Sequence, residues 1–360
     1  MNKIQSHYFS QLTGIRAIAA YMVFIHHYNF LNPKYFGSVV HGMASELHIG
    51  VTFFFVLSGF LIAYRYSDMN SFSFKQYLTY RIARIYPVYF VFTVITFISI
   101  SSYSNKDWIV FFCNISFLRG FFDQLKFSLV AQGWSLTVEE TFYLLAPLFF
   151  IFLNKSKSAF IFIPLLSIIV GLSIRMIFKD FHIAGFFESF EFVFNYTFFG
   201  RAFEFTAGIL LAYLIKSNIK LPPISLYVGI SFCILSIYAL FRLQNNGEYD
   251  FGIRTDLGKL INTVILPFLG IVPLFYGLIT TNSVLSRILG SKIFQILGKS
   301  SYVFYLIHMG IIHSVIGKYL SSNLLIHFFI IQVISIIVWR YFEEPINLFV
   351  RKKFTVANSK

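Results

Sequence analysis

The chain has 360 residues, of which 57% are hydrophobic and only 12% are charged, and its formal net charge is +14. A soluble globular domain carries about 25% charged residues. This composition therefore excludes a water-soluble globule and predicts a polytopic membrane protein. The positive charge is typical of loops that flank the cytoplasmic ends of membrane helices, and no motif of nucleic-acid binding accompanies it. The two cysteines, Cys113 and Cys233, support neither a disulfide framework nor a metal site.

Ten apolar segments are long enough, at about 17–25 residues each, to cross about 30 Å of hydrocarbon. They are 12–31, 48–66, 82–103, 138–154, 158–178, 199–216, 223–242, 260–280, 300–318 and 323–342. The expected fold is thus an all-α bundle of about ten transmembrane helices in the cell membrane. The apolar stretch 108–118 is too short to span and is expected to lie at the interface or to re-enter, and 181–198 is ambiguous.

Basic residues gather at alternate ends of these segments. The richer set is Lys3, Arg65, Lys75, Arg81, Arg84, Lys155, Lys157, Lys216, Lys220, Arg287, Lys292, Lys299, Arg351, Lys352, Lys353 and Lys360. Because cytoplasmic loops carry an excess of Lys and Arg, these ends and both termini are predicted to be cytoplasmic. The large loops 104–137 and 243–259 are then expected to face outward.

The first apolar segment contains two side chains that are costly in lipid, Arg16 and His27. A charge at the bilayer centre costs about 2.5–3.5 kcal/mol on insertion scales, so such residues are candidates for a functional site. Eleven residues at about 100° each bring the two to within about 20° of one helical face, about 16 Å apart along the axis. We expect Arg16 near the cytoplasmic end and His27 near the outer end, with His26 pointing elsewhere as support or packing.

Two charged pairs are spaced three residues apart and are therefore neighbours on a helix. Arg81 and Arg84 in RIARIYP are either anchors at the cytoplasmic surface or a clamp for phosphate groups, to which paired guanidinium groups are suited. Arg201 and Glu204 in GRAFEFTAG are either an ion pair that holds the bundle together or part of a substrate site.

Glu139 and Glu140 enter the apolar segment of WSLTVEETFYLLAPL. One interpretation is local: Ser135 or Thr137 caps a helix, and the two acids favour its first turns. The other interpretation is functional, because adjacent carboxylates can bind sugar hydroxyls or orient a histidine.

Two further segments have polar or small residues within apolar runs. Tyr302 and His308 lie on a polar stripe in GKSSYVFYLIH, where the histidine is either satisfied in the core or functional. Ser58 and Gly59 in GVTFFFVLSGFLI allow another helix backbone to approach closely, as small residues do between membrane helices.

Seven blocks of the chain occur in the order found in the acyltransferase 3 family, which the sequence resembles over residues 8–346. They are LTGIRAIAAYMVFIHH, GVTFFFVLSGFLI, RIARIYP, WSLTVEETFYLLAPL, RAFEFTAG, GKSSYVFYLIH and FEEP. In the first block the family places an Arg or Lys eleven positions before its key histidine, which matches Arg16 and His27 rather than His26. The family usually has Asp where this chain has Thr52.

The resemblance implies an integral-membrane enzyme that takes an acyl group from acyl-CoA in the cytoplasm. The acyl group is expected to be acetyl, with succinyl as an alternative. The acceptor is a hydroxyl of a surface or lipid-linked sugar such as O-antigen of lipopolysaccharide, capsule, exopolysaccharide or peptidoglycan. A transmembrane domain is expected over 1–346, followed by a basic cytoplasmic tail over 347–360. Partners other than substrates and membrane lipid are not indicated, and a homo-oligomer stays open.

The expected chemistry places acyl-CoA phosphates on Arg81 and Arg84 with Arg16, and a general base at His27, whose ordinary pKa near 6.5 suits proton transfer. An acyl-imidazole intermediate stays open. Glu139 or Glu140 orients the base or binds the sugar. Two rivals stay open: a transporter without covalent chemistry, and a membrane O-acyltransferase of another fold in which His308 is catalytic. No metal motif is present.

Overall fold

The computed structural model describes residues 8–68, 72–100, 102–181, 183–244 and 250–357. Lys3, Lys360 and residues 358–360 of the predicted tail lie outside these ranges. The described residues form helices and loops, with an isolated β-bridge between Phe122 and Phe186. The chain divides into two compact units, of which unit 1 is Met1–Asn70 with Phe203–Ser301, and unit 2 is Ser71–Ala202 with Tyr302–Lys360.

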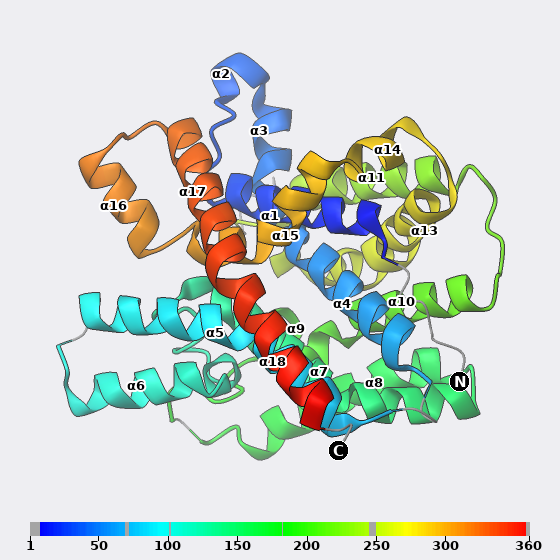
Figure 1. Ribbon diagram of the computed structural model, residues 1–360, viewed down its shortest axis with the longest axis horizontal. Coiled ribbons are helices and arrows are strands. Elements are labelled where there is room, and N and C mark those ends of the chain that lie inside the picture. The colour runs from blue at the N-terminus through cyan, green and yellow to red at the C-terminus, as the bar shows by residue number, and fades with distance from the viewer. Residues whose placement is uncertain (1–7, 69–71, 101, 182, 245–249, 358–360) are drawn as a thin grey trace. The chain divides into compact units, whose positions relative to one another are not determined.

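Unit 1 contains the N-terminal helices and the helices from the later part of α10 to most of α15 (Figure 1). Its elements are α1 (Ser10–His27), α2 (Pro33–Phe36), α3 (Ser38–Ser45), η1 (Leu47–Ile49), α4 (Gly50–Tyr66), the later part of α10 (Phe198–Lys216), α11 (Ser225–Gln244), η5 (Gly252–Arg254), α12 (Asp256–Leu260), η6 (Ile261–Ile271), α13 (Val272–Thr280), α14 (Val284–Leu289) and most of α15 (Lys292–Ile307). η6 is a π-helix of 11 residues.

Two glycines let α4 and α10 meet backbone to backbone within unit 1. A Cβ atom on Gly59 would lie 2.1 Å from the backbone oxygen of Phe205, and one on Gly208 would lie 2.0 Å from that of Val56. No side chain fits at either position, because real Cβ contacts are longer than 3 Å. The close approach predicted at Ser58–Gly59 is confirmed, and it is of the kind that small residues permit between membrane helices.

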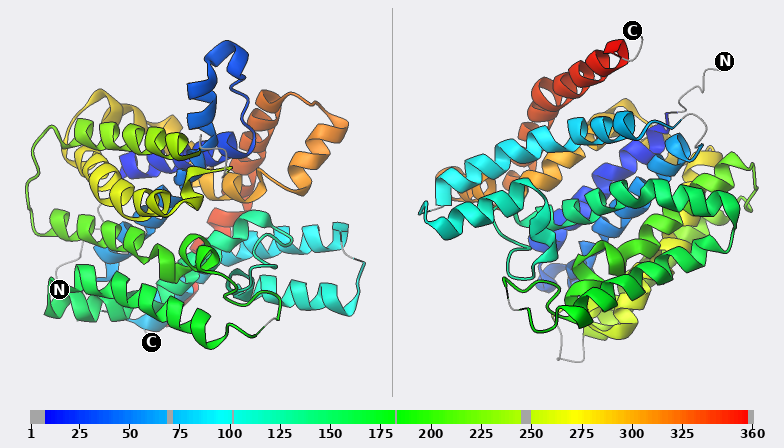
Figure 2. Two further views of the ribbon diagram at one scale, coloured as in Figure 1. Left: turned by 180° about the vertical axis from the view of Figure 1, so that it is seen from behind. Right: turned by 90° about the horizontal axis from the view of Figure 1, so that it is seen from below.

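Unit 2 holds the remaining helices. Its elements are α5 (Phe74–Ile100), α6 (Asn105–Ile115), η3 (Leu118–Phe121), η4 (Ala131–Gly133), α7 (Trp134–Lys155), α8 (Ala159–Ile177), α9 (Phe190–Tyr196), the start of α10, the end of α15, α16 (Ile311–Tyr319), α17 (Leu324–Val338), η7 (Trp339–Glu343) and α18 (Glu344–Ala357). α6 lies alongside the second half of α5 (Figure 1, Figure 2), where the rings of Phe97 and Trp108 are 4.9 Å apart. The predicted tail boundary at 347 falls inside α18.

The membrane-protein prediction is confirmed. Among the described residues, eight helical segments are long and apolar enough to span a membrane, or nine if a bent pair counts as one span. They are Ser38–Tyr66, Phe74–Ile100, Ala131–Lys155, Ala159–Ile177, Phe190–Lys216, Ser225–Gln244, Asp256–Thr280, Leu324–Lys353, and the bent pair Lys292–Ile307 with Ile311–Tyr319. Every one of the ten expected segments contains helix. However, α1 is not among the candidate spans, since its 18 residues include Arg16, His26 and His27.

Several expected segments differ from the observed helices; for example, the segment expected over 82–103 is α5, which begins at Phe74 and ends at Ile100. α1 ends at His27 rather than at 31, and Asn29, just beyond it, donates its side-chain amide to the backbone oxygen of His41. The expected span 300–318 is broken by 84° between α15 and α16. The break contains Gly310 at φ 81° and ψ −142°, a conformation that residues with a Cβ rarely adopt.

Candidate active site

His27 is the last residue of α1, and its side chain is exposed. Its Nδ1 lies 2.9 Å from the backbone oxygen of Val23, one turn earlier. Because a carbonyl oxygen can only accept, Nδ1 must carry the hydrogen in this contact. In the neutral imidazole the lone pair is then on Nε2, which is the atom of His27 that can take a proton.

His26 is half-buried and held differently. Its Nδ1 lies 2.5 Å from the backbone oxygen of Ser45, and its ring contacts those of His27, His48 and Phe251 at centroid distances of 4.8, 5.4 and 5.0 Å. The two adjacent histidines therefore occupy different environments: His26 is packed among three rings, whereas the side chain of His27 is exposed.

Arg16 lies on the same unbroken helix as His27, and its side chain is half-buried. The spacing of eleven residues within one helix corresponds to about 16 Å along the axis. Both residues belong to unit 1, whereas Arg81, Arg84, Glu139, Glu140 and His308 belong to unit 2.

Thr52 occupies the position where the resemblance led us to expect Asp. Its hydroxyl donates to the side-chain oxygen of Asn262 at 2.9 Å, and neither residue has exposed surface. Asn262 is the second residue of the π-helix η6. A neutral hydrogen bond between α4 and η6 therefore takes the place that a carboxylate would hold.

Unit 2 brings several predicted site residues into one polar cluster. The carboxylate of Glu140 on α7 interacts electrostatically with Arg81 on α5 and with Glu139. Tyr302, near the end of α15, donates to the backbone oxygen of Ile85 at 2.8 Å and interacts with Glu139 and Glu140. The cluster thus combines acids, a cation and a phenol.

The predicted cap at Ser135 or Thr137 is wrong. α7 begins at Trp134 with Gly133 as its N-cap residue, and no side chain caps it. Ser135 and Thr137 are inside the helix, where their hydroxyls bond to the backbone oxygens of Gln132 and Phe117. Glu139 and Glu140 are therefore past the first turn of the helix, and capping does not explain them.

Arg81 and Arg84 have different surroundings. Arg81 is buried, with 7% of its surface exposed, and lies in the electrostatic range of Glu140. Arg84 is half-buried. Of the two, Arg84 is therefore the more accessible to a phosphate group from outside the protein.

Arg201 and Glu204 both lie on α10 and are both buried. Arg201 donates from Nη1 to the backbone oxygen of Asn195 at 3.0 Å, and its guanidinium lies 6.0 Å from the centre of the Trp134 ring. Glu204 has no exposed surface. The contacts of Arg201 with α9 and α7 favour a structural role for its guanidinium.

His308 follows the last residue of α15 and has no exposed surface. Its Nδ1 lies 2.7 Å from the backbone oxygen of Tyr305 and 3.4 Å from the amide nitrogen of Gln132. The hydroxyl of Tyr305 in turn lies 2.8 Å from that of Ser135. This network is typical of a histidine satisfied inside the protein, in contrast to His27.

Three buried charged residues were not among the predicted site residues: Glu46, Glu343 and Arg119. Glu46 has no exposed surface and accepts the backbone N–H of Gly252 at 2.8 Å. Glu343 on η7 is 6% exposed and interacts electrostatically with Tyr302. A Glu two residues before a His in HGMASELHIG was the available signal for Glu46, and FEEP was the signal for Glu343.

Arg119 lies in the segment 104–137, which was expected to be an outward-facing loop, but its side chain is fully buried. Its guanidinium donates to Asn114 Oδ1 at 2.5 Å, to the backbone oxygens of Val130 and Ala131 at 2.6 and 3.2 Å, and to that of Ser128. Burial lowers the pKa of Arg119, but a guanidinium stays charged at neutral pH. The carbonyl oxygens replace the water that the cation loses.

Within the part of the chain that the structure describes, no three His, Cys, Asp or Glu residues are grouped so that they could hold a metal ion. No solved structure matches the chain. Proteins from Staphylococcus aureus strains COL, MSSA476 and MRSA252, each named "Putative O-acetyltransferase", are 24% identical over 377 residues, which cover 94% of this chain. The alignment covers 57% of each relative, so the chain spans little more than half their length. The family model described as an acyltransferase domain matches residues 9–342, and the chain therefore belongs to the acyltransferase 3 family of integral-membrane acyltransferases.

Proposed function

We propose that the protein transfers an acetyl group from cytoplasmic acetyl-CoA to a hydroxyl of a cell-surface polysaccharide sugar, such as one in O-antigen, capsule or exopolysaccharide. Membership of the acyltransferase 3 family and similarity to proteins named as O-acetyltransferases support acetyl transfer. Family membership also argues against the rival transporter without covalent chemistry. The polysaccharide acceptor follows from the sequence resemblance.

The contact between His27 Nδ1 and Val23 carries the proposed mechanism, because it leaves the lone pair on Nε2 of an exposed imidazole. Nε2 removes the proton of the acceptor hydroxyl as the oxygen attacks the thioester carbonyl. The C–S bond then breaks, and the CoA thiolate takes the proton from the imidazolium. The products are the O-acetyl sugar and free CoA.

The other polar residues have supporting roles in this proposal. In unit 2 we assign a contact with phosphate groups of the donor to Arg84, while the buried Arg81 lies in the electrostatic range of Glu140. In unit 1 we assign the same chemistry to Arg16. Glu139 and Glu140 accept hydrogen bonds from acceptor hydroxyls. The sequence predicted that Arg81 and Arg84 both contact the donor. In this proposal the contact falls mainly to Arg84.

The test is an assay with acetyl-CoA labelled in the acetyl group and the full-length protein in lipid nanodiscs, with lipid-linked or polysaccharide acceptors. Label that enters the glycan as an alkali-labile ester supports the proposal. Replacement of Arg84 by Gln is expected to raise KM for acetyl-CoA with little change in kcat, and Arg287→Gln is a matched control. Absence of ester in every acceptor, with glycan instead carried across sealed vesicles, would favour the transporter.

A further inference from the structure

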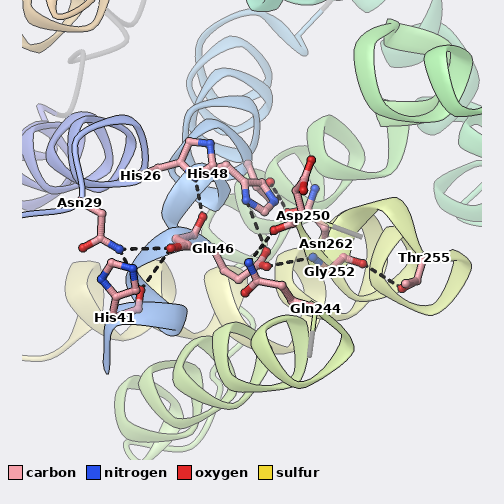
Figure 3. Close-up of polar contacts among 12 residues, drawn as sticks. His26, Asn29, His41, Glu46, His48, Gln244, Asp250, Gly252, Thr255 and Asn262 are labelled. Carbon is pink, nitrogen blue, oxygen red and sulfur yellow. Dashed lines mark hydrogen bonds and ion pairs between the residues drawn. The ribbon is translucent and has the colours of Figure 1, made fainter. Parts of the chain in front are cut away.

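A second polar cluster lies beside the end of α1 in unit 1 and has no part in the proposed mechanism (Figure 3). Its centre is Glu46, between α3 and η1, which has no exposed surface. One carboxylate oxygen, Oε1, accepts the backbone N–H of Gly252 at 2.8 Å, and the other, Oε2, lies 3.6 Å from Nδ1 of His48. The carboxylate thus joins two segments that are 206 residues apart in the chain.

The turn that contains Gly252 is fixed on its other side as well. A Cβ atom on Gly252 would lie 2.2 Å from the backbone oxygen of Leu240, so the turn is pressed directly against α11. Gln244 on α11 also donates its side-chain amide to the backbone oxygen of Asp250 at 2.5 Å. Between these two attachments lies Phe251, whose ring packs against His26.

Glu46 also belongs to the segment Ser45–His48, which contacts His26 from the other side. Ser45, which precedes Glu46, supplies the carbonyl that holds His26 Nδ1, and His48 supplies a ring contact with His26. His26 is therefore enclosed by two segments that are joined through Glu46. Its ring is in turn 4.8 Å from that of His27, in an edge-to-face arrangement at 70°.

We propose that Glu46 is a positioning residue for acyl transfer, which holds Ser45, His48 and Phe251 around His26 and so fixes the orientation of the His27 imidazole. The inference rests on the proposed role of His27. Glu46 itself does not touch the substrate. Its side chain is the buried acidic group next to the row of imidazoles His48, His26 and His27.

The decisive variant is Glu46→Gln in the full-length protein. Its amide oxygen can still accept the N–H of Gly252, but an amide NH2 group replaces the carboxylate oxygen that lies 3.6 Å from His48 Nδ1. We expect an unchanged melting temperature, a kcat at least about tenfold lower and a KM for acetyl-CoA within about twofold of wild type, because misplacement of a base acts on the chemical step. Asp250→Asn is the matched control: its carboxylate, on the same turn, is 77% exposed, and kcat is expected to stay within about twofold.

A folded Glu46→Gln protein with wild-type kcat would overturn the inference, since Glu46 would then serve only to anchor Gly252. If that variant does not fold, Phe251→Leu decides, because it removes the ring contact with His26 and leaves Glu46 in place. A lower kcat with unchanged KM supports positioning, and wild-type kcat contradicts it. Failure of the proposed function itself is separate, since it would appear as absence of acetyl transfer by the wild-type protein.

Discussion

The imidazole of His27 is hydrogen-bonded from Nδ1 to the backbone oxygen of Val23 at 2.9 Å, one turn back along the helix that it ends. This contact selects one tautomer and directs Nε2 away from the α1 backbone. His308 has a similar contact with Tyr305 but no exposed surface. Exposure and tautomer together therefore favour His27 over His308 as the base.

The hydrogen bond from Thr52 to Asn262 is expected to stabilise the contact between α4 and η6. Replacement of Thr52 by Val keeps the shape but leaves the buried amide oxygen of Asn262 without this donor, at a cost of about 1–3 kcal/mol. Thermal unfolding in detergent, followed by tryptophan fluorescence, measures the loss. Thr52→Ser retains the hydroxyl and should unfold close to wild type; equal loss in both variants would mean that the methyl group matters instead.

The close approach of α4 and α10 predicts that Gly59 cannot be replaced. Gly59→Ala puts a Cβ atom 2.1 Å from a backbone oxygen, so the helices must separate, at a cost of about 1–3 kcal/mol. Gly317→Ala on α16 is the control, because its Cβ would meet His327 at an ordinary 3.4 Å. The measurement is the unfolding temperature of each of the two variants, Gly59→Ala and Gly317→Ala. A Gly59→Ala protein as stable as the control would refute this backbone contact.

Arg119 is expected to hold the segment from 114 to 131 in place. Arg119→Met leaves Asn114 Oδ1 and three carbonyl oxygens without their donor and should cost at least about 2–3 kcal/mol. Limited proteolysis should cut this segment faster than in wild type. Arg119→Lys, which keeps the charge but has fewer donors, should be intermediate. Unchanged proteolysis in Arg119→Met would show that the loop does not depend on the cation.

The start of α6 is expected to loosen in acid. Asp107 Oδ2 accepts from the Ser102 hydroxyl at 2.8 Å and from the backbone N–H of Ser104 at 3.0 Å, and these bonds lower the pKa of Asp107. Because the folded pKa is below the unfolded value of about 3.9, the stabilisation is complete above that value and is lost as pH falls through the folded pKa. Amide hydrogen exchange over 105–108, corrected for intrinsic rates, measures this loss of stabilisation at the start of α6. Asp107→Asn should show no such pH dependence, and the same profile in both proteins would exclude Asp107 as the cause.

Much of the fold could be predicted because membrane helices have strong local signals. Apolar length identified the helical segments, including the segment 12–31 that places Arg16 and His27 on α1. The single Gly310 inside an apolar run gave no sign of the 84° bend, because glycine is also common inside membrane helices. The start of α7 was misplaced because Ser135 resembled a cap, whereas the helix begins one residue earlier at Trp134.

The buried polar residues were harder to predict because their partners are remote or belong to the backbone. Glu46 accepts the backbone N–H of Gly252, which lies 206 residues later in the chain, and such a pairing has no signature in the sequence. Arg119 resembled a surface charge, since its acceptors are largely carbonyl oxygens. By contrast, the helical phase that separates His27 from His26 depends only on their spacing from Arg16 in the sequence.

The most direct test of the account is acetyl transfer by His27→Ala beside His26→Ala and His308→Ala, with each protein verified to be folded and inserted. The assay follows labelled acetyl groups from acetyl-CoA into glycan ester. The account predicts loss of at least about a hundredfold in kcat for His27→Ala, as for removal of a general base, and partial activity in the other two. Wild-type activity of His27→Ala, or loss confined to His308→Ala, would contradict it.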